Sequence, residues 1–196
     1  MTTEIKRIQE LEIEIKIRID ASSANAPGIE NTKGRILANN FQVLHERAFE
    51  RNIVFDTPDA KLKARKCLLR LRKKGDTNTV TFKQPLEKPL SRDDTTYKIK
   101  QETEVEVSDF EGMENIFTGL GYEVFFIYEK YREEFQKEDV KIMLDETPIG
   151  NFIEIEGPGE AIDRTARELG YSKSDYITDN YLTLFRKVGG VGHMRF

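Results

Sequence analysis

The sequence predicts an α+β protein built on one antiparallel β-sheet of about eight strands. One reason is the stretch "LEIEIKIRI", Leu11 to Ile19, in which aliphatic and charged residues alternate strictly, as in a strand with one apolar and one charged face. A second is that similar segments follow along the chain, most of them joined by short turns. A third is that only three or four segments have the apolar spacing of helices. Eight antiparallel strands are enough to close into a barrel that holds a small ligand.

The first half of the chain contains four predicted strands and one short helix. After the opening strand, a polar stretch has room for a helix at residues 29–37, although glycine and proline residues oppose it. Residues 41–55 are expected to be extended. The segments "CLLRLRKK" and "TNTVTFKQ" then flank Gly75 and Asp76, which indicates a β-hairpin. A proline-containing loop is expected at residues 85–96.

The second half contains the other four strands and the remaining helices. A long strand is predicted for Tyr97–Val107, and Ser108 and Glu111 have the spacing of a capping box that would begin a helix ending near Gly121. The segments "EVFFIYEKYREEF", "VKIMLDE" and "NFIEIEG" are three further strands. Helices are expected at residues 160–169 and through "SDYITDNYLTLFRK".

The composition indicates a single domain, residues 1–187, followed by a flexible tail at residues 188–196. Of the 196 residues, 38% are hydrophobic, which is enough for one core. Charged residues make up 34%, yet the formal net charge is only -4, so positive and negative residues are mixed. Because a general nucleic-acid binder would be basic, we expect no nucleic-acid partner.

Cysteine content and hydropathy predict a cytoplasmic protein. The first residues, "MTTEIKRIQE", have no apolar core typical of a signal peptide, and no apolar run is long enough to span a bilayer, so no membrane association is expected. Cys67 is the one cysteine, and His45 and His193 lie too far apart in sequence to suggest a structural zinc site with it. A homodimer is compatible with the sequence, which fixes no oligomeric state.

The charged residues are segregated by sign along the strands. Carboxylates occur two residues apart, as in Glu12 and Glu14, and so do cations, as in Arg70 and Arg72. Two architectures produce this pattern: the charged faces are solvated over an aliphatic core, or the sheet is rolled so that they line a wet interior. Paired carboxylates can gather a hard divalent cation, whereas arginine and lysine can bind polyphosphate oxygens. An interior with both would suit a metal-complexed triphosphate.

The sequence resembles the CYTH superfamily, the triphosphate tunnel metalloenzymes. The segment "EIEIK", Glu12 to Lys16, resembles the ExExK signature of that family, and the resemblance continues in order through "VFDTPDAKLKARKCLLRLRKK", "TVTFKQP", "KQETEVEVSD", "GYEVFFIYEKYREEF" and "VKIMLDETPIGNFIEIEG". It is closest to the bacterial class IV adenylyl cyclase-like branch. The resemblance implies an eight-stranded antiparallel tunnel with helices packed outside and the charged strand faces turned inward.

The resemblance also implies site residues. The residues expected to bind Mg²⁺ or Mn²⁺ are Glu12, Glu14, Glu102, Glu104, Asp145, Glu154 and Glu156. Those expected to bind the triphosphate are Lys16, Arg70, Arg72, Lys83, Lys130 and Arg132, with Lys16, Arg70 and Arg72 also acting in catalysis.

The implied function is that of a metal-dependent enzyme acting on a small triphosphate. The family branch favours an adenylyl cyclase, which converts ATP into cyclic AMP and pyrophosphate. A phosphohydrolase acting on inorganic tripolyphosphate, thiamine triphosphate or a nucleotide is the alternative, and a non-catalytic polyphosphate or nucleotide sensor is a third. The paired carboxylates argue against the sensor, because a pure anion binder gains nothing from aiming carboxylates at phosphate.

Overall fold

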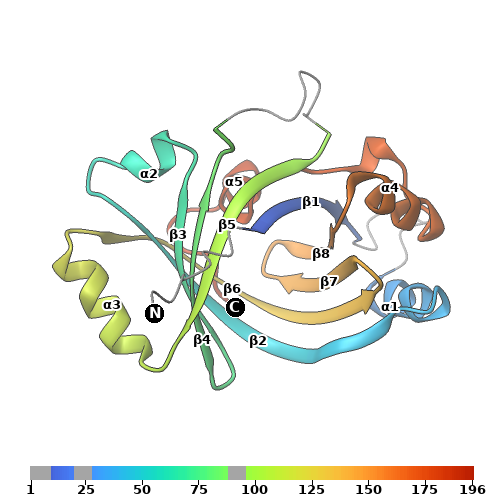
Figure 1. The fold of residues 1–196 in the computed structure, drawn as a ribbon, viewed down its shortest axis with the longest axis horizontal. Helices are drawn as coiled ribbons and strands as arrows, with labels where there is room; N and C mark the ends of the chain where they lie inside the picture. The colour runs from blue at the N-terminus through green and yellow to red at the C-terminus, as the bar shows by residue number, and fades with distance from the viewer. Residues whose placement is uncertain (1–9, 20–27, 88–95) are drawn as a thin grey trace, which may run out of the picture.

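A computed structural model describes residues 10–19, 28–87 and 96–196, and its eight strands form a closed antiparallel barrel (Figure 1). The order around the barrel is β1-β5-β4-β3-β2-β6-β7-β8. This confirms the predicted α+β barrel. The strands are β1 (Glu10–Arg18), β2 (Gln42–Asp56), β3 (Leu68–Lys74), β4 (Thr77–Gln84), β5 (Lys98–Val107), β6 (Glu123–Lys137), β7 (Val140–Thr147) and β8 (Gly150–Glu156).

Helices lie outside the barrel and at one of its ends. The predicted helices at residues 29–37 and 160–169 are confirmed within one residue, and the hairpin turn falls at Gly75, whose positive φ of 56° suits glycine. The loop expected at residues 85–96 lies mostly outside the described residues. The helices are α1 (Ile29–Ala38), α2 (Lys61–Ala64), α3 (Phe110–Gly119), α4 (Gly159–Glu168), the 3₁₀ turn η1 (Lys173–Asp175) and α5 (Tyr181–Lys187).

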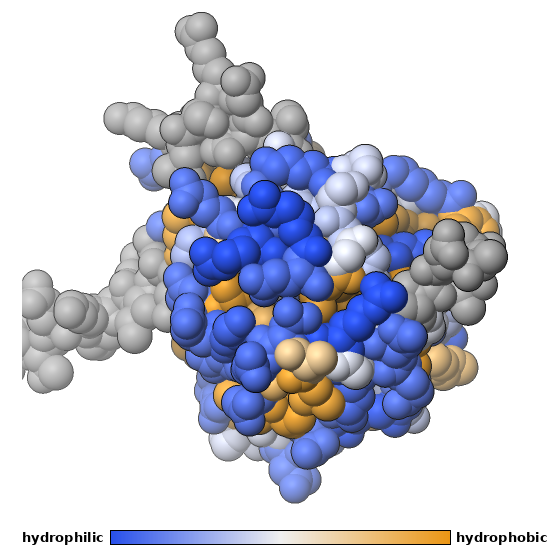
Figure 2. Space-filling model, turned by 90° about the vertical axis from the view of Figure 1, so that its right-hand side faces the viewer, coloured by the Kyte–Doolittle hydropathy of each residue, from blue (hydrophilic) through white to orange (hydrophobic). Residues whose placement is uncertain are grey.

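The aliphatic strand faces point outward and are covered by helices. On one side, β1, β6, β7 and β8 pack their isoleucines and leucines against α1 and α4, as Ile15, Ile155 and Ile162 illustrate, each 1% exposed or less. On another, Ile53 and Leu71 pack against α2 and α3. The outer surface on the α1 and α4 side is mostly hydrophilic (Figure 2). Of the two architectures that the sequence allows, the structure is therefore the rolled one, with the charged faces inside.

Two predicted helix features differ from the structure. The segment expected to be helical through residues 174–187 is broken, because Ile177 is extended and exchanges backbone hydrogen bonds with Lys16 of 2.8 and 3.0 Å before Asn180 caps α5. The cap of α3 is Asp109, whose side chain accepts from the Gly112 N–H, and not the expected Ser108. Asp and Ser are both good N-caps, so neighbouring polar residues compete for the position.

The C-terminal residues cover a strand edge. β7 pairs with β6 only from Tyr131 onward, which leaves the earlier part of that edge without a β7 partner. Met194 fills this place: its N–H donates to the Ile127 carbonyl and its carbonyl accepts from the Glu129 N–H, at 2.9 Å each. The Met194 side chain is fully buried. Residues 188–196, expected to be a flexible tail, therefore lie partly packed against β6, because backbone pairing and apolar burial together hold Met194 there.

Among the described residues, no helix is long and apolar enough to span a membrane.

Candidate active site in the barrel interior

The barrel interior is lined by side chains that the sequence analysis singled out. Alternation along each strand turns the residues of one parity inward, so charged pairs two residues apart become neighbours inside. Eleven of the predicted site residues are buried or nearly so, whereas Glu104 and Glu156 lie nearer to solvent. The eleven are Glu12, Glu14, Lys16, Arg70, Arg72, Lys83, Lys130, Arg132, Asp145, Glu154 and, with its side chain 19% exposed, Glu102.

The carboxylates of β1 face lysines from β5, the next strand, and from β4, the one beyond it. Glu12 pairs closely with Lys83, which also lies 3.1 Å from Glu102, and Glu14 accepts from Lys98 at 2.5 Å. The second oxygen of Glu12 is buried without a hydrogen-bond partner among the described residues. Burial, and after it the neighbouring Glu14 charge, raise the pKa of Glu12 above its usual range despite Lys83. Negative charge is therefore in local excess at this place.

Asp145 is the centre of a second cluster. Its carboxylate accepts two hydrogen bonds of 2.6 Å from the Arg132 guanidinium, one of 3.0 Å from Lys130 and one of 2.6 Å from the Tyr181 hydroxyl. This is the bidentate arrangement in which arginine binds a carboxylate most strongly. Asp145 therefore acts here as the counter-ion of two cations.

Glu154 extends this cluster toward β1. It pairs with Lys16 at 2.7 Å and closely with Arg132. Burial alone would raise its pKa, but Lys16 and then Arg132 hold the pKa of Glu154 well below its usual range. The carboxylate is therefore charged and shared by two of the cations expected to bind phosphate.

The two arginines of β3 form a third group. Arg70 donates to the Thr81 hydroxyl at 2.9 Å and to the Tyr128 hydroxyl at 3.3 Å. Arg72 donates to the Asn52 side chain at 3.0 Å. The closest partners of both guanidinium groups are thus uncharged, and carboxylates lie farther away, with Glu104 at 3.5 Å from Arg70 and Glu50 at 3.6 Å from Arg72.

Several interior residues are absent from the predicted set, among them Glu50, Asn52, Lys98, Tyr128 and Tyr181. Glu50 and Asn52 lie two apart on β2, so the spacing rule that found the other pairs could have found them. The pairing of β2 with β6 is regular from Ala48 to Val54, so alternation holds at both residues. Tyr181 comes from α5, and no strand pattern could indicate that a helix enters the barrel.

The carboxylates are suited in chemistry to a divalent metal, although they are dispersed. Among the described residues, no three aspartate, glutamate, histidine or cysteine side chains are grouped so as to hold a metal ion. Glu14 and Glu156 are nevertheless register partners on β1 and β8, and Glu12 precedes Glu14 by two residues on the same face. Burial raises the pKa of Glu156 as it does that of Glu12. Burial would raise the pKa of Glu14 too, but Lys98 holds it below its usual range. Glu12, with its unpartnered buried oxygen, and Glu156 therefore fit a hard divalent cation best, with the charged Glu14 between them.

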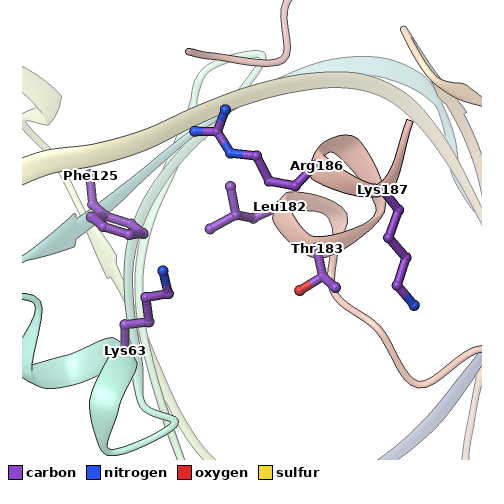
Figure 3. A pocket seen from close by; sticks show the side chains of 6 residues that line it. All are labelled: Lys63, Phe125, Leu182, Thr183, Arg186 and Lys187. Atoms are coloured by element: carbon purple, nitrogen blue, oxygen red, sulfur yellow. The ribbon is translucent and has the colours of Figure 1, made fainter. Parts of the chain in front are cut away.

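A cavity of about 440 Å³ lies on the other face of α5, outside the barrel interior. It is lined by Lys63, Phe125 and four residues of α5: Leu182, Thr183, Arg186 and Lys187 (Figure 3). Tyr181 and Leu184 of the same helix pack instead against Phe126, Tyr128 and Phe152 at the barrel end. The helix therefore separates this cavity from the charged site.

Comparison with known proteins assigns the family. A model of the CYTH domain matches residues 10–181, which include all eight strands. A protein called "putative adenylate cyclase" in Methanocaldococcus jannaschii is 28% identical over 185 residues, which cover 89% of this chain and 98% of that protein.

Solved structures have the same fold. A "putative adenylate cyclase" from Vibrio parahaemolyticus superposes with a TM-score of 0.73 at 19% identity, covering 91% of this chain and 99% of its own. A "putative adenylyl cyclase" from Hippeastrum, described as having a dominant triphosphatase activity, has a TM-score of 0.60 at 17% identity, covering 92% of this chain and 97% of its own. Since the domain model spans most of the sequence and the barrel has the expected charged interior, the chain belongs to the CYTH family of triphosphate-processing enzymes.

Proposed function

We propose that this enzyme binds a triphosphate chain inside the barrel with the help of a divalent metal and cleaves a phosphoanhydride bond, by hydrolysis. The observation that carries the proposal is the set of inward-facing cations, which come from β1, β3, β4 and β6 and converge on one interior. Such cations match the oxygens of a polyphosphate, arginine through paired donors and lysine as a point charge.

The proposed binding residues are Lys16, Arg70, Arg72, Lys83, Lys130 and Arg132. In hydrolysis, a water oxygen forms a bond to the terminal phosphorus while the bond from that phosphorus to the bridging oxygen breaks. The bond electrons pass to the leaving phosphate chain, and the water proton is released. Lys16, Arg70 and Arg72 offset the negative charge that develops on these oxygens, and they are fixed before the reaction by their barrel partners.

The metal ligands proposed first are Glu12, Glu14 and Glu156, with Glu102 and Glu104 beside them. Enzymes of this family are generally metal-dependent. Bound Mg²⁺ or Mn²⁺ would supply charge neutralisation at the phosphate oxygens. Asp145 and Glu154 remain in the ligand set expected from the sequence, but their oxygens are engaged by Arg132, Lys130 and Lys16.

Hydrolysis is the first candidate because it requires binding of the phosphate chain alone, without a separate site for the nucleoside. The aromatic rings at the α5 end of the barrel pack against one another, with centroids 5.6 Å apart for Phe152 and Tyr181 and 5.9 Å for Tyr128 and Tyr181. Lys16 and Lys130 also lie over the Tyr181 ring, 4.6 and 5.3 Å from its centroid, so this ring is already engaged by side chains of the barrel. The activity described for the Hippeastrum protein agrees with this choice.

Cyclisation of ATP is the second candidate, and the name of the Methanocaldococcus jannaschii relative favours it. It uses the same phosphate-binding residues, but the ribose 3′-hydroxyl attacks the α-phosphorus and pyrophosphate leaves. It therefore requires that the nucleoside be held in addition to the phosphates.

The test is a product analysis with purified protein, Mg²⁺ or Mn²⁺ and, separately, ATP, tripolyphosphate and thiamine triphosphate. Orthophosphate is the expected product, and the compound from which it is released is the substrate. Formation of cyclic AMP and pyrophosphate from ATP would mean that the enzyme is a cyclase and not a hydrolase. Binding without any product would favour the sensor.

The double variant Glu12→Gln with Glu14→Gln tests the metal ligands in the same assay. It is expected to lower turnover by at least about 100-fold, because the amides keep the shape but lose the charge that holds a cation. Glu46→Gln, an exposed change on β2, is the matched control. Unchanged turnover in the double variant would remove these two residues from the metal site.

A further inference from the structure

Glu50 is a buried carboxylate in the barrel interior that the proposed reaction does not use. Its side chain is fully buried on β2, and neither of its oxygens has a hydrogen-bond partner among the described residues. A buried charged group is normally hydrogen-bonded, so this arrangement requires an explanation.

Cations surround Glu50 at ion-pair distance without forming hydrogen bonds to it. Its carboxylate lies 3.6 Å from Arg72, 3.7 Å from Lys130 and 4.0 Å from Lys74. In register it stands opposite Lys74 on β3 and Lys130 on β6, so it lies between two strands that carry phosphate-binding candidates. Burial would raise its pKa, but Arg72 and then Lys130 hold it below the usual range, so Glu50 is negatively charged.

The contrast with Asp145 indicates what Glu50 does. Asp145 fixes Arg132 through two hydrogen bonds of 2.6 Å and so occupies two of its donors. Glu50 lies near Arg72 and Lys130 but takes up none of their donors by hydrogen bonding within the described structure. It therefore acts on them through charge alone, and leaves for another anion those N–H groups that Asn52 and Asp145 do not occupy.

We propose that Glu50 is a positioning residue that tunes the affinity of Arg72 and Lys130 for phosphate. Its negative charge draws both cations toward the β2 wall and balances them when no phosphate is bound. When phosphate is bound, the same charge repels it and weakens the hold on the product chain, which speeds release. This inference rests on the proposed function, in which Arg72 and Lys130 bind the phosphate chain.

The test is calorimetric binding of inorganic tripolyphosphate and of pyrophosphate, with Mg²⁺ present, to the wild type and to Glu50→Gln. Removing one buried negative charge beside the anion is expected to tighten binding by about tenfold. Glu50→Asp keeps the charge but draws it one methylene away from the cations, so a smaller tightening of about two- to threefold is expected. Glu46→Gln, exposed on the same strand, is the control and should bind as the wild type does.

Steady-state kinetics separate tuning from a merely structural role. If Glu50 speeds release, Glu50→Gln lowers both kcat and KM and strengthens inhibition by pyrophosphate, whereas a damaged site would raise KM. Glu50→Asp should show the same changes to a smaller degree, which keeps the test available if the glutamine variant does not fold. Unchanged or weaker binding in a folded variant, with a normal wild type, would overturn this inference alone. A wild type that binds neither anion would overturn the proposed function and this inference with it.

Discussion

At the scale of single residues, the interior is organised by a few carboxylates that each hold several cations. Asp145 is the clearest case, since three side chains from two elements donate to its two oxygens. Removing one partner of a buried ion pair leaves the others with uncompensated charge, which costs far more than breaking a pair on the surface. Asp145 is therefore expected to matter for stability whether or not substrate is present.

Asp145→Asn is expected to lower the free energy of unfolding by about 3–5 kcal/mol, because Arg132 and Lys130 lose their charged partner in a buried place. Urea denaturation of the free protein measures it. The matched control is Asp179→Asn, which removes the carboxylate that pairs with the exposed Lys187 and should cost less than about 1 kcal/mol. Equal losses in the two variants would contradict the role of Asp145 as a buried centre.

Most of the interior residues could be predicted from the sequence, because alternation fixes which residues share a face. Alternation alone does not say whether that face is inside or outside; closure of the sheet decides it, and the family resemblance supplied that step. It also does not give the partner of each charge. Asp145 was expected to bind metal, but its hydrogen bonds to Arg132 and Tyr181 depend on where three elements meet in space.

At the scale of elements, the C-terminal segment completes two incomplete strand edges. β1 pairs with β5 only as far as Glu14, and Ile177 bonds to Lys16 just beyond that point. Met194 does the same for β6 on the side that β7 leaves open. α5 lies between these two attachment points, which explains why Tyr181 reaches Asp145 from outside the sheet.

Met194→Ala is expected to destabilise the protein by about 2–5 kcal/mol, because the Met194 side chain is fully buried beside Phe126 and Tyr128. Thermal or urea unfolding measures this loss. Val191→Ala in the same segment removes a side chain that is 85% exposed and should have little effect. A Met194 variant as stable as the wild type would mean that this segment does not hold the barrel end.

Strands could be predicted better than the C-terminal helices, for a physical reason. Alternation of apolar and charged residues within a short segment indicates a strand, so the ends of β5 to β8 could be predicted within about two residues. The break at residues 176–180 arises from the pairing of Ile177 with Lys16, which are more than 150 residues apart. The pattern of residues near Ile177 gives no indication of a contact with so distant a residue.

At the scale of the whole molecule, the closed barrel holds cations and carboxylates that mostly balance one another. A metal-complexed polyphosphate brings both signs of charge into this interior, so it can exchange partners with the existing pairs. A ligand that binds only the folded state stabilises it in proportion to the logarithm of its concentration.

Mg²⁺-tripolyphosphate at a hundredfold excess over its Kd is therefore expected to stabilise the fold by about 2.7 kcal/mol, or to raise Tm by roughly 5–10 °C. Differential scanning calorimetry measures the shift. Adding EDTA to the same sample should remove the part of the Tm shift that depends on bound metal. A shift that is identical with and without EDTA would argue against the carboxylates of β1 and β8 as a metal site.

The barrel closes where its first strand meets its last. β1 pairs with β8 through residues 14–18 and 152–156, and Lys16 then bonds to Ile177. During synthesis, β1 emerges from the ribosome long before either partner exists, since domains are made from the N-terminus at about 5–20 residues per second. The charged interior therefore forms only after β8 and Ile177 have been made. Until then, the residues proposed to bind phosphate on β1 and those on β6 are not held in one enclosure.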